Sequence, residues 1–321
     1  MTNYWLYDFQ PSISKQYQLD LCQGQTPLDI SPTSITKLTN FKKLLFKRED
    51  QNPHGSFKDR ALAYQISYLH SIQSSFCVLS SSGNAAISCC AFAQKTNIKP
   101  IILVSPQIDP GKLSQIIRYQ PFLLIKSAQA KRLANYIHAK YHIPILNPTK
   151  DDHAALGFET LGQEIYTQNP DCEAIFSYST SGASLLGIFN FYQKNHLPLP
   201  RLFAAQISYS ASTAISFYHF AQAKQITNAI QQSNGQYQFV SQATASQIHH
   251  LLKKNLINSS IEGAAATQLA IQISQAQADI HNAVIVVSGT EHQLINNPDY
   301  PIRELQTKSD IDRLFQQQKI E

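Results

Sequence analysis

The feature that most constrains the fold of this chain is an alternation of short apolar runs with longer helical segments. The apolar runs are 76–80, 100–104, 122–125, 174–178, 202–207 and 283–287, and helical patterns lie over 84–96, 112–119, 128–141, 185–193 and 262–277. Because the runs are apolar throughout rather than at every second position, both faces of each strand must be covered. The predicted fold class is therefore α/β, and the length allows roughly two domains, each with an open, mostly parallel sheet.

The composition argues against several classes of partner. Only 15% of the 321 residues are charged, and the net charge of +5 comes from a shortage of acidic residues rather than from basic clusters. The longest lysine runs, Lys42-Lys43 and Lys253-Lys254, are too short for a nucleic-acid surface. The five cysteines lack metal-ligand spacing. No apolar run approaches the ~18 residues of a membrane span, and the first residues lack a signal-peptide pattern. We expect a soluble, cytoplasmic protein without metal, nucleic acid or membrane.

One turn contains the strongest candidate for chemistry, the sequence Asn-Pro-His-Gly-Ser-Phe-Lys-Asp-Arg at residues 52–60. Pro53 and Gly55 predict a turn, and Ser56 is a suitable helix N-cap. Lys58 then lies in the first helical turn, where the helix dipole disfavours a cation and makes the amine easier to keep neutral. A neutral lysine amine can form a Schiff base, although a lone lysine is more often a solvated surface residue.

This nine-residue segment resembles the cofactor-lysine motif of pyridoxal-phosphate enzymes of fold type II, the tryptophan synthase β-subunit superfamily. Within that group the chain looks most like threonine synthase. The resemblance implies pyridoxal 5'-phosphate bound to Lys58 and an active site in the cleft between two α/β domains. It places the smaller domain at 48–148 and the larger at 1–47 and 149–321. Residues 22–28 partly match a Gly-Glu-Gly-x-Thr-Pro-Leu signature of threonine synthases, at the expected distance before the lysine.

A polar loop follows the first predicted strand, at Ser80-Ser81-Ser82-Gly83-Asn84. Taken alone, it is an ordinary capped helix start with free N–H groups for an anion. The resemblance implies that Ser81, Ser82 and Ala85 bind the substrate carboxylate and that Asn84 contacts the cofactor ring at its phenolic oxygen. Alanine at position 85 removes a hydroxyl that the family usually has there.

Two further loops follow predicted strands. Free N–H groups at a helix start favour a phosphate in the loop Thr180, Ser181, Gly182, Ala183 and Ser184, with an ordinary capped helix start as the alternative. The family's loop is richer in glycine, and Ala183 places a Cβ where a glycine would allow positive φ. Ser288, after the last strand, matches the hydroxyl that meets the pyridine nitrogen in threonine synthases. Glu262 matches a residue of the active-site wall.

The residues expected to face the substrate are less regular. Lys112 and Lys150 are candidate cations for it, with a solvated helical lysine as the alternative for Lys112. After Asn147-Pro148 the family has an arginine suited to a substrate phosphate. This chain lacks that arginine and has Glu159 where lysine is usual.

The resemblance implies a lyase like threonine synthase, which converts O-phosphohomoserine and water to threonine and phosphate and works as a possible homodimer on a small amino acid. The absent arginine favours an alternative, β-elimination or β-replacement on a serine- or threonine-type amino acid. A catalytically degenerate relative that only binds cofactor or a partner is a third hypothesis. A nicotinamide enzyme is disfavoured because no Gly-x-Gly-x-x-Gly follows a strand.

Overall fold

The computed structural model describes residues 4–148, 150–208 and 223–320. The chain divides into two compact units. The first unit consists of Met1–Asp8, Cys22–Ala61 and Ala154–Glu291, and the second consists of Phe9–Leu21, Leu62–His153 and His292–Glu321. Helix α2 (Lys58–Ser71) begins in the first unit, and its residues from Leu62 onward belong to the second.

The first unit is built on a six-stranded sheet with the order β1-β2-β9-β6-β7-β8. Among the described strands of this sheet, β1 alone runs antiparallel to its neighbour. The strands are β1 (Leu28–Ile30), β2 (Lys43–Lys47), β6 (Ala174–Tyr178), β7 (Arg201–Ser208), β8 (Gln236–Ser241) and β9 (Asn282–Val286). The central strands β6, β7 and β9 are almost wholly buried, as expected for strands covered on both faces.

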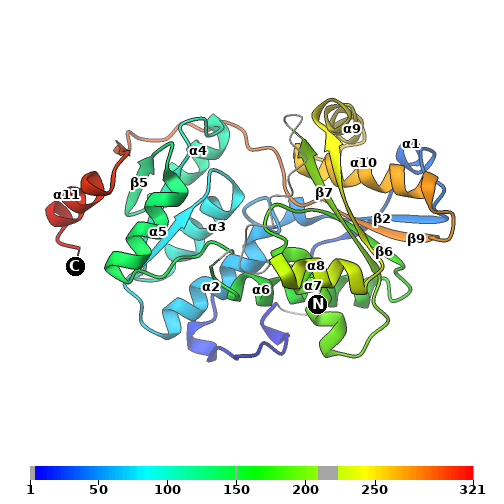
Figure 1. The fold of residues 1–321 in the computed structure, drawn as a ribbon, viewed down its shortest axis with the longest axis horizontal. Helices are drawn as coiled ribbons and strands as arrows, with labels where there is room; N and C mark the ends of the chain where they lie inside the picture. Colours follow the sequence, from blue (N-terminus) through cyan, green and yellow to red (C-terminus); the bar gives the residue numbers. More distant parts are fainter. Residues whose placement is uncertain (1–3, 149, 209–222, 321) are drawn as a thin grey trace. The chain divides into compact units, whose positions relative to one another are not determined.

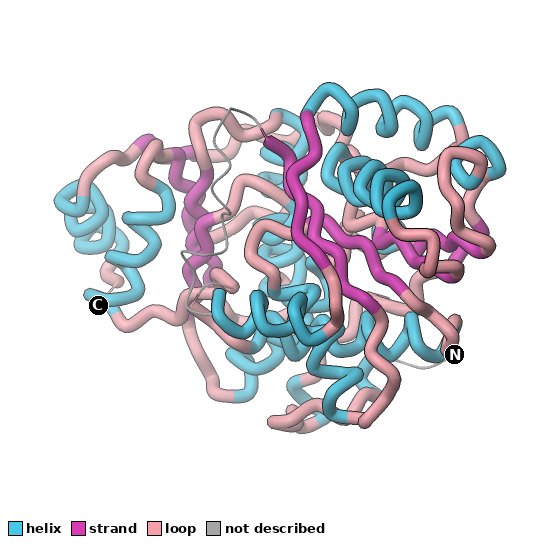
Figure 2. The backbone as a smooth tube through the Cα atoms, turned by 45° about the vertical axis from the view of Figure 1, so that its right-hand side comes forward, coloured by secondary structure: helices cyan, strands magenta, loops and turns pink. Residues whose placement is uncertain are grey.

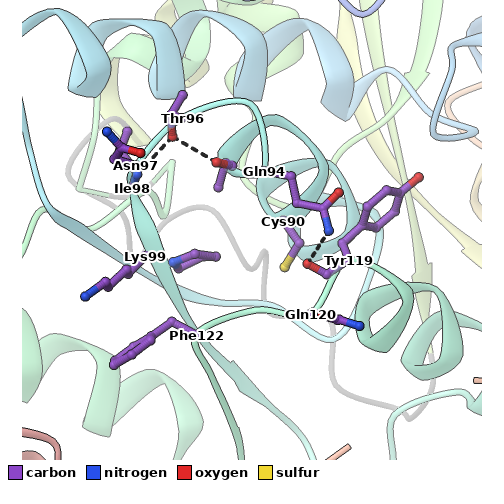
Figure 3. Close-up of a pocket in the computed structure, with 11 residues that line it drawn as sticks. Cys90, Gln94, Thr96, Asn97, Ile98, Lys99, Tyr119, Gln120 and Phe122 are labelled. Carbon is purple, nitrogen blue, oxygen red and sulfur yellow. Dashed lines mark hydrogen bonds between the residues drawn. The ribbon is translucent and has the colours of Figure 1, made fainter. Parts of the chain in front are cut away.

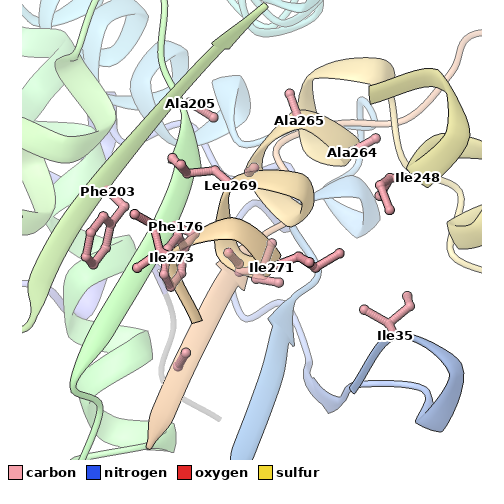
Figure 4. Close-up of a cluster of buried hydrophobic side chains, with 14 of the residues drawn as sticks. Ile35, Phe176, Phe203, Ala205, Ile248, Ala264, Ala265, Leu269, Ile271 and Ile273 are labelled. Atoms are coloured by element: carbon pink, nitrogen blue, oxygen red, sulfur yellow. The ribbon is translucent and has the colours of Figure 1, made fainter. Parts of the chain in front are cut away.

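Helices cover both faces of this sheet, α9 and α10 on one side and α7 and α8 on the other (Figure 1). The helices of the unit are α1 (Thr33–Thr36), α6 (His153–Gln168), α7 (Ala183–Lys194), α8 (Ala223–Gln232), α9 (Gln242–Lys254) and α10 (Ile261–Ala276). Alanines of α10 let this helix lie close to the strands, and Leu269 and Ile273 pack there beside Phe176 and Phe203 (Figure 4). The rings of Phe176 and Phe203 stack with centroids 4.6 Å apart.

The second unit has a parallel four-stranded sheet with the order β10-β5-β4-β3. Figure 2 shows its strands in magenta with helices beside them. The strands are β3 (Phe76–Ser80), β4 (Lys99–Val104), β5 (Leu123–Lys126) and β10 (Ile302–Glu304), and the helices are α3 (Asn84–Ala93), α4 (Pro110–Arg118), α5 (Ala130–Tyr141) and α11 (Lys308–Gln318). Its core joins these strands to α5 and α11 through residues such as Ile101, Leu133 and Phe315.

The α/β class with two mostly parallel sheets confirms the predicted fold. The units have other boundaries than the expected domains: residues 48–61, which include Lys58, group with the first unit, and residues 9–21 and 292–321 group with the second. Residues 292–321 belong to the second unit because β10 pairs with β5 and α11 packs on α5. No helix of the described ranges is both long and apolar enough to cross a bilayer.

Candidate functional site

The segment before α2 fixes Lys58 against the end of β9. Gly55 has a φ of +76°, which allows the tight turn there. Ser56 then forms an antiparallel bridge with Gly289, and the N–H of Phe57 donates to the carbonyl of Ser288 at 3.1 Å. Lys58 is the first residue of α2, and its own N–H donates to the Ser56 hydroxyl at 3.3 Å. The lysine and Ser288 are therefore held together at the carboxyl edge of the first unit's sheet.

The side chain of Lys58 lies in an apolar environment. Its Nζ is 4.7 Å from the ring centroid of Phe57 and 5.5 Å from that of Phe158. Burial lowers the pKa of Lys58 to about 8, because the charged form loses its water. Within the described residues no carboxylate pairs with this amine. A lysine in this state can supply a neutral, nucleophilic amine near neutral pH.

A buried ion cluster lies two residues beyond the lysine. Arg60 is fully buried and makes a two-pronged contact with Glu49, Nε to Oε2 at 2.7 Å and Nη2 to Oε1 at 2.8 Å. It makes a second such contact with Glu164, with both N···O distances at 2.8 Å. Lys47 adds a contact to Glu164 at 2.6 Å. Burial alone would raise the pKa of Glu164, but the charges of Arg60 and Lys47 lower it to about 2. Two cations and two anions thus balance in the interior.

The structure also gives a physical role to the partial motif at residues 22–28. The N–H of Gly24 donates to the side-chain oxygen of Asn52 at 2.9 Å. The Thr26 hydroxyl donates to Glu49 at 2.5 Å. The motif therefore closes the ion cluster and holds the turn that precedes Lys58, a role for which the sequence had no signal.

The loop between β6 and α7 has the features of an anion site. Gly182 is the N-cap of the twelve-residue α7, has a φ of +77°, and no side chain caps the helix. The hydroxyl of Ser179, a residue 2% exposed, has no hydrogen-bond partner within the described residues. Free N–H groups, a helix N-terminus and an unpaired buried hydroxyl together favour a phosphate. Positive φ falls on Gly182 and not on Ala183, so the Cβ of Ala183 causes no strain.

This loop and Ser288 lie at the same edge of one sheet. β6 and β9 are parallel neighbours in which Phe176 is opposite Ile285, so the residues that follow them emerge side by side. Ser288 is 4% exposed. The amino end of α10 also reaches this place, because the N–H of Ser260 donates to the carbonyl of Gly289 at 2.7 Å. Glu262 lies partly buried in the first turn of α10.

The loop expected to bind a substrate carboxylate belongs to the second unit, where it joins β3 to α3. The Ser82 hydroxyl accepts a hydrogen bond from the N–H of Ser105 at 2.6 Å, and the Ser81 hydroxyl accepts one from Gly83 at 3.3 Å. Asn84 begins α3 and is bonded to His292 at 2.8 Å. His292 is a residue that the sequence motifs missed, and the one available signal was a histidine soon after the last central strand.

Neither candidate cation for the substrate, Lys112 or Lys150, forms an ion pair with any residue that the structure describes. Lys112 lies in the first turn of α4, and its N–H is capped by Asp109 at 2.9 Å. Lys150 is exposed. Glu159, which stands where the family has lysine, is buried and accepts a hydrogen bond from Tyr7 at 2.6 Å. Glu159 therefore fastens the amino-terminal segment.

The second unit also has a cavity of about 270 Å³ lined by the ends of α3 and α4 and the start of β4 (Figure 3). The Gln94 amide donates to the Tyr119 carbonyl at its rim, at 2.8 Å. Because β3 and β4 are parallel, this cavity lies at the opposite edge of the sheet from the loop at residues 81–84. It is a separate feature of the second unit.

The chain belongs to the family described as pyridoxal-phosphate dependent enzymes, whose model matches residues 19–289. Among curated relatives, threonine synthase of Methanocaldococcus jannaschii is 30% identical over 117 residues, which is 36% of this chain and 29% of that enzyme. Threonine synthase of Bacillus sp. (strain ULM1) is 33% identical over 112 residues, or 35% of this chain and 31% of that enzyme. The matched part thus spans less than a third of either relative.

Several solved structures share this fold. Maize serine racemase superposes with a TM-score of 0.71 at 18% identity, covering 95% of both chains. Threonine deaminase isoform 2 from Solanum lycopersicum superposes with a TM-score of 0.71 at 18% identity, covering 97% of this chain and 92% of that one. These likenesses show the fold.

The residues of the first unit fit pyridoxal phosphate. Lys58 offers an amine of lowered pKa to the aldehyde. The glycine-capped start of α7, with the unpaired Ser179 hydroxyl beside it, suits the phosphate. Ser288 offers a buried hydroxyl at the same edge of the sheet.

Proposed function

We propose that this protein is a pyridoxal-phosphate-dependent lyase of the threonine synthase type, acting on a small amino acid. The observation that carries the proposal is the amine of Lys58, desolvated by two phenylalanine rings and fastened through Phe57 to Ser288. The first reaction to test is the conversion of O-phosphohomoserine and water to threonine and phosphate, because several curated relatives of this chain are threonine synthases.

Each residue has a defined task in this proposal. When bound, pyridoxal phosphate supplies an electron sink for charge that develops at the substrate Cα. Lys58 holds the cofactor and then, as a neutral amine, removes and returns the proton at Cα. Thr180, Ser181, Gly182, Ala183 and Ser184 bind the phosphate through the start of α7. The Ser288 hydroxyl faces the ring nitrogen without bringing a carboxylate to it. Ser81, Ser82, Asn84 and Ala85 are proposed for the substrate carboxylate and the ring.

Substitution Lys58→Ala tests the proposal. The purified protein is incubated with pyridoxal phosphate and reduced with borohydride, and the modified peptide is identified by mass. We expect the wild type and the exposed control Lys95→Ala to retain the cofactor on the peptide with Lys58, and Lys58→Ala to retain none. Attachment at another lysine, or the same visible absorbance in Lys58→Ala, would refute the role of Lys58.

A second reaction, elimination from an unphosphorylated serine or threonine, is favoured by one observation. The segment after Asn147 contains no arginine and instead pairs Asp151 with His153 at 2.5 Å. The carboxylate of Asp151 would repel a dianionic phosphate group of a substrate bound at this segment. Phosphate release from O-phosphohomoserine, measured beside keto-acid release from serine and threonine, separates the two reactions.

A further inference from the structure

Asn84 has its side-chain amide fixed by one neighbour. The Nε2 of His292 lies 2.8 Å from the Oδ1 of Asn84, and both side chains are only partly exposed. Within the described residues no other hydrogen bond to the Asn84 amide is found. An amide can present either its carbonyl or its NH₂ group to a ligand, so the neighbour that takes one end decides which end remains.

His292 is itself held along α4. A Cβ on Gly111 would come within 2.0 Å of the His292 carbonyl oxygen, so the backbone contact at that point requires glycine. Two residues further on, the N–H of Ile295 donates to the Ser114 hydroxyl at 3.2 Å. The Asn297 side chain donates to the Ser114 carbonyl at 2.7 Å. The segment 292–297 thus holds His292 at a fixed place relative to α4.

We propose that His292 is a positioning residue that donates from Nε2 to the Asn84 carbonyl and so leaves the Asn84 NH₂ group to face the ligand. Both the protonated ring and the neutral ring with hydrogen on Nε2 make this contact. Asn84 then offers its NH₂ group to an acceptor atom of the ligand. This inference rests on the proposed function, in which the acceptor is the phenolic oxygen of pyridoxal phosphate.

The orientation is tested first in the cofactor-free protein. Long-range ¹H–¹⁵N spectra of histidine rings distinguish hydrogen on Nε2 from hydrogen on Nδ1, and His292→Gln identifies the resonance. We expect hydrogen on Nε2 of His292. A neutral ring with hydrogen only on Nδ1 would overturn the proposal, because Asn84 would then have to turn its NH₂ group to the histidine.

The effect on the ligand is tested by titrating each variant with pyridoxal phosphate. We expect His292→Leu to weaken binding about three- to tenfold, the loss of one neutral hydrogen bond, and His292→Gln to recover most of it. Gly111→Ala should act like His292→Leu because it displaces the His292 backbone, whereas the exposed neighbour Gln293→Leu should bind like the wild type.

A spectroscopic readout separates orientation from general damage to the fold. The balance between the visible and near-ultraviolet bands of the bound cofactor follows hydrogen bonding at its phenolic oxygen, and we expect it to move in His292→Leu and not in Gln293→Leu. If the ratio of the two absorption bands and the affinity for pyridoxal phosphate are the same in all variants, the proposal is overturned. If the wild type takes up no pyridoxal phosphate, the proposed function fails, while the ring spectra still decide how Asn84 is oriented.

Discussion

The ion cluster around Arg60 makes a quantitative prediction for the variant Glu164→Gln. The Oε1 of Glu164 accepts from Arg60 at 2.8 Å and from the N–H of Gln25 at 2.7 Å, and its Oε2 accepts from Arg60 at 2.8 Å and from Lys47 at 2.6 Å. A glutamine keeps the shape but turns one of these acceptors into a donor. Two donors then face an NH₂ group, and the cluster retains one unbalanced positive charge.

Two routes give the same magnitude. Lowering the pKa of Glu164 from its ordinary 4.5 to about 2 corresponds to about 3 kcal/mol in favour of the ionised carboxylate. Removing one partner of a buried pair typically costs about 3–5 kcal/mol. Glu164 is 10% exposed and the side chains of Arg60 and Lys47 are fully buried, so water cannot compensate. We expect Glu164→Gln to lower the free energy of unfolding by about 3–5 kcal/mol.

Urea unfolding followed by circular dichroism measures this change, with Glu159→Gln as the matched control. Glu159 lies in the same helix, α6, and is as well buried, but it accepts a hydrogen bond from the neutral Tyr7. A glutamine at this position can still accept that hydrogen bond through its amide oxygen, so Glu159→Gln should cost no more than about 1 kcal/mol. Equal destabilisation by the two variants, or less than about 1 kcal/mol for Glu164→Gln, would refute the idea that charge balance holds this interior together.

Three further predictions follow from the same unit. Trapping of pyridoxal phosphate by borohydride should rise with pH around about 8, because the lowered pKa of Lys58 leaves half of its amine neutral there; a midpoint above 10 would contradict its desolvation. Gly182→Ala should destabilise the protein by about 1–3 kcal/mol and weaken cofactor binding, since its Cβ would lie 2.4 Å from Ile226; combined with Ile226→Ala, the total loss measured by calorimetry should be smaller than the sum of the two single losses. The stabilisation from Glu164, whose folded pKa is lowered, should be complete above pH about 4.5 and disappear as the pH falls through about 2, an acid dependence that Glu164→Gln should lack.

The central strands could be predicted from sequence because each is an unbroken apolar run, as at residues 174–178 and 283–287. The edge strands β8 and β10 could not be predicted in this way. β10 (Ile302–Glu304) is three residues long and carries two charges, so it becomes a strand through its pairing with β5. β8 (Gln236–Ser241) alternates glutamine with Tyr237 and Phe239 and is not an unbroken apolar run, so a search for such runs does not detect it.

The residues of the candidate site also fall into those that the sequence predicts and those that it does not. Lys58, Gly182 and Ser288 stand out because each lies in a short local motif next to a turn. The contact between Arg60 and Glu164 joins residues 104 positions apart, and that between His292 and Asn84 joins residues 208 apart. No local sequence pattern encodes such pairs, because the contacts form only when the spatial order of the strands in the sheets brings distant segments together.

That order has a consequence for the nascent chain on the ribosome. β9 lies between β2 and β6, yet it is the last strand of its sheet to be synthesised. Until residue 286 has left the exit tunnel, β2 and β6 each keep an unpaired edge in a largely apolar segment. The sheet of the first unit can therefore be completed only late in translation, when β9 inserts between β2 and β6.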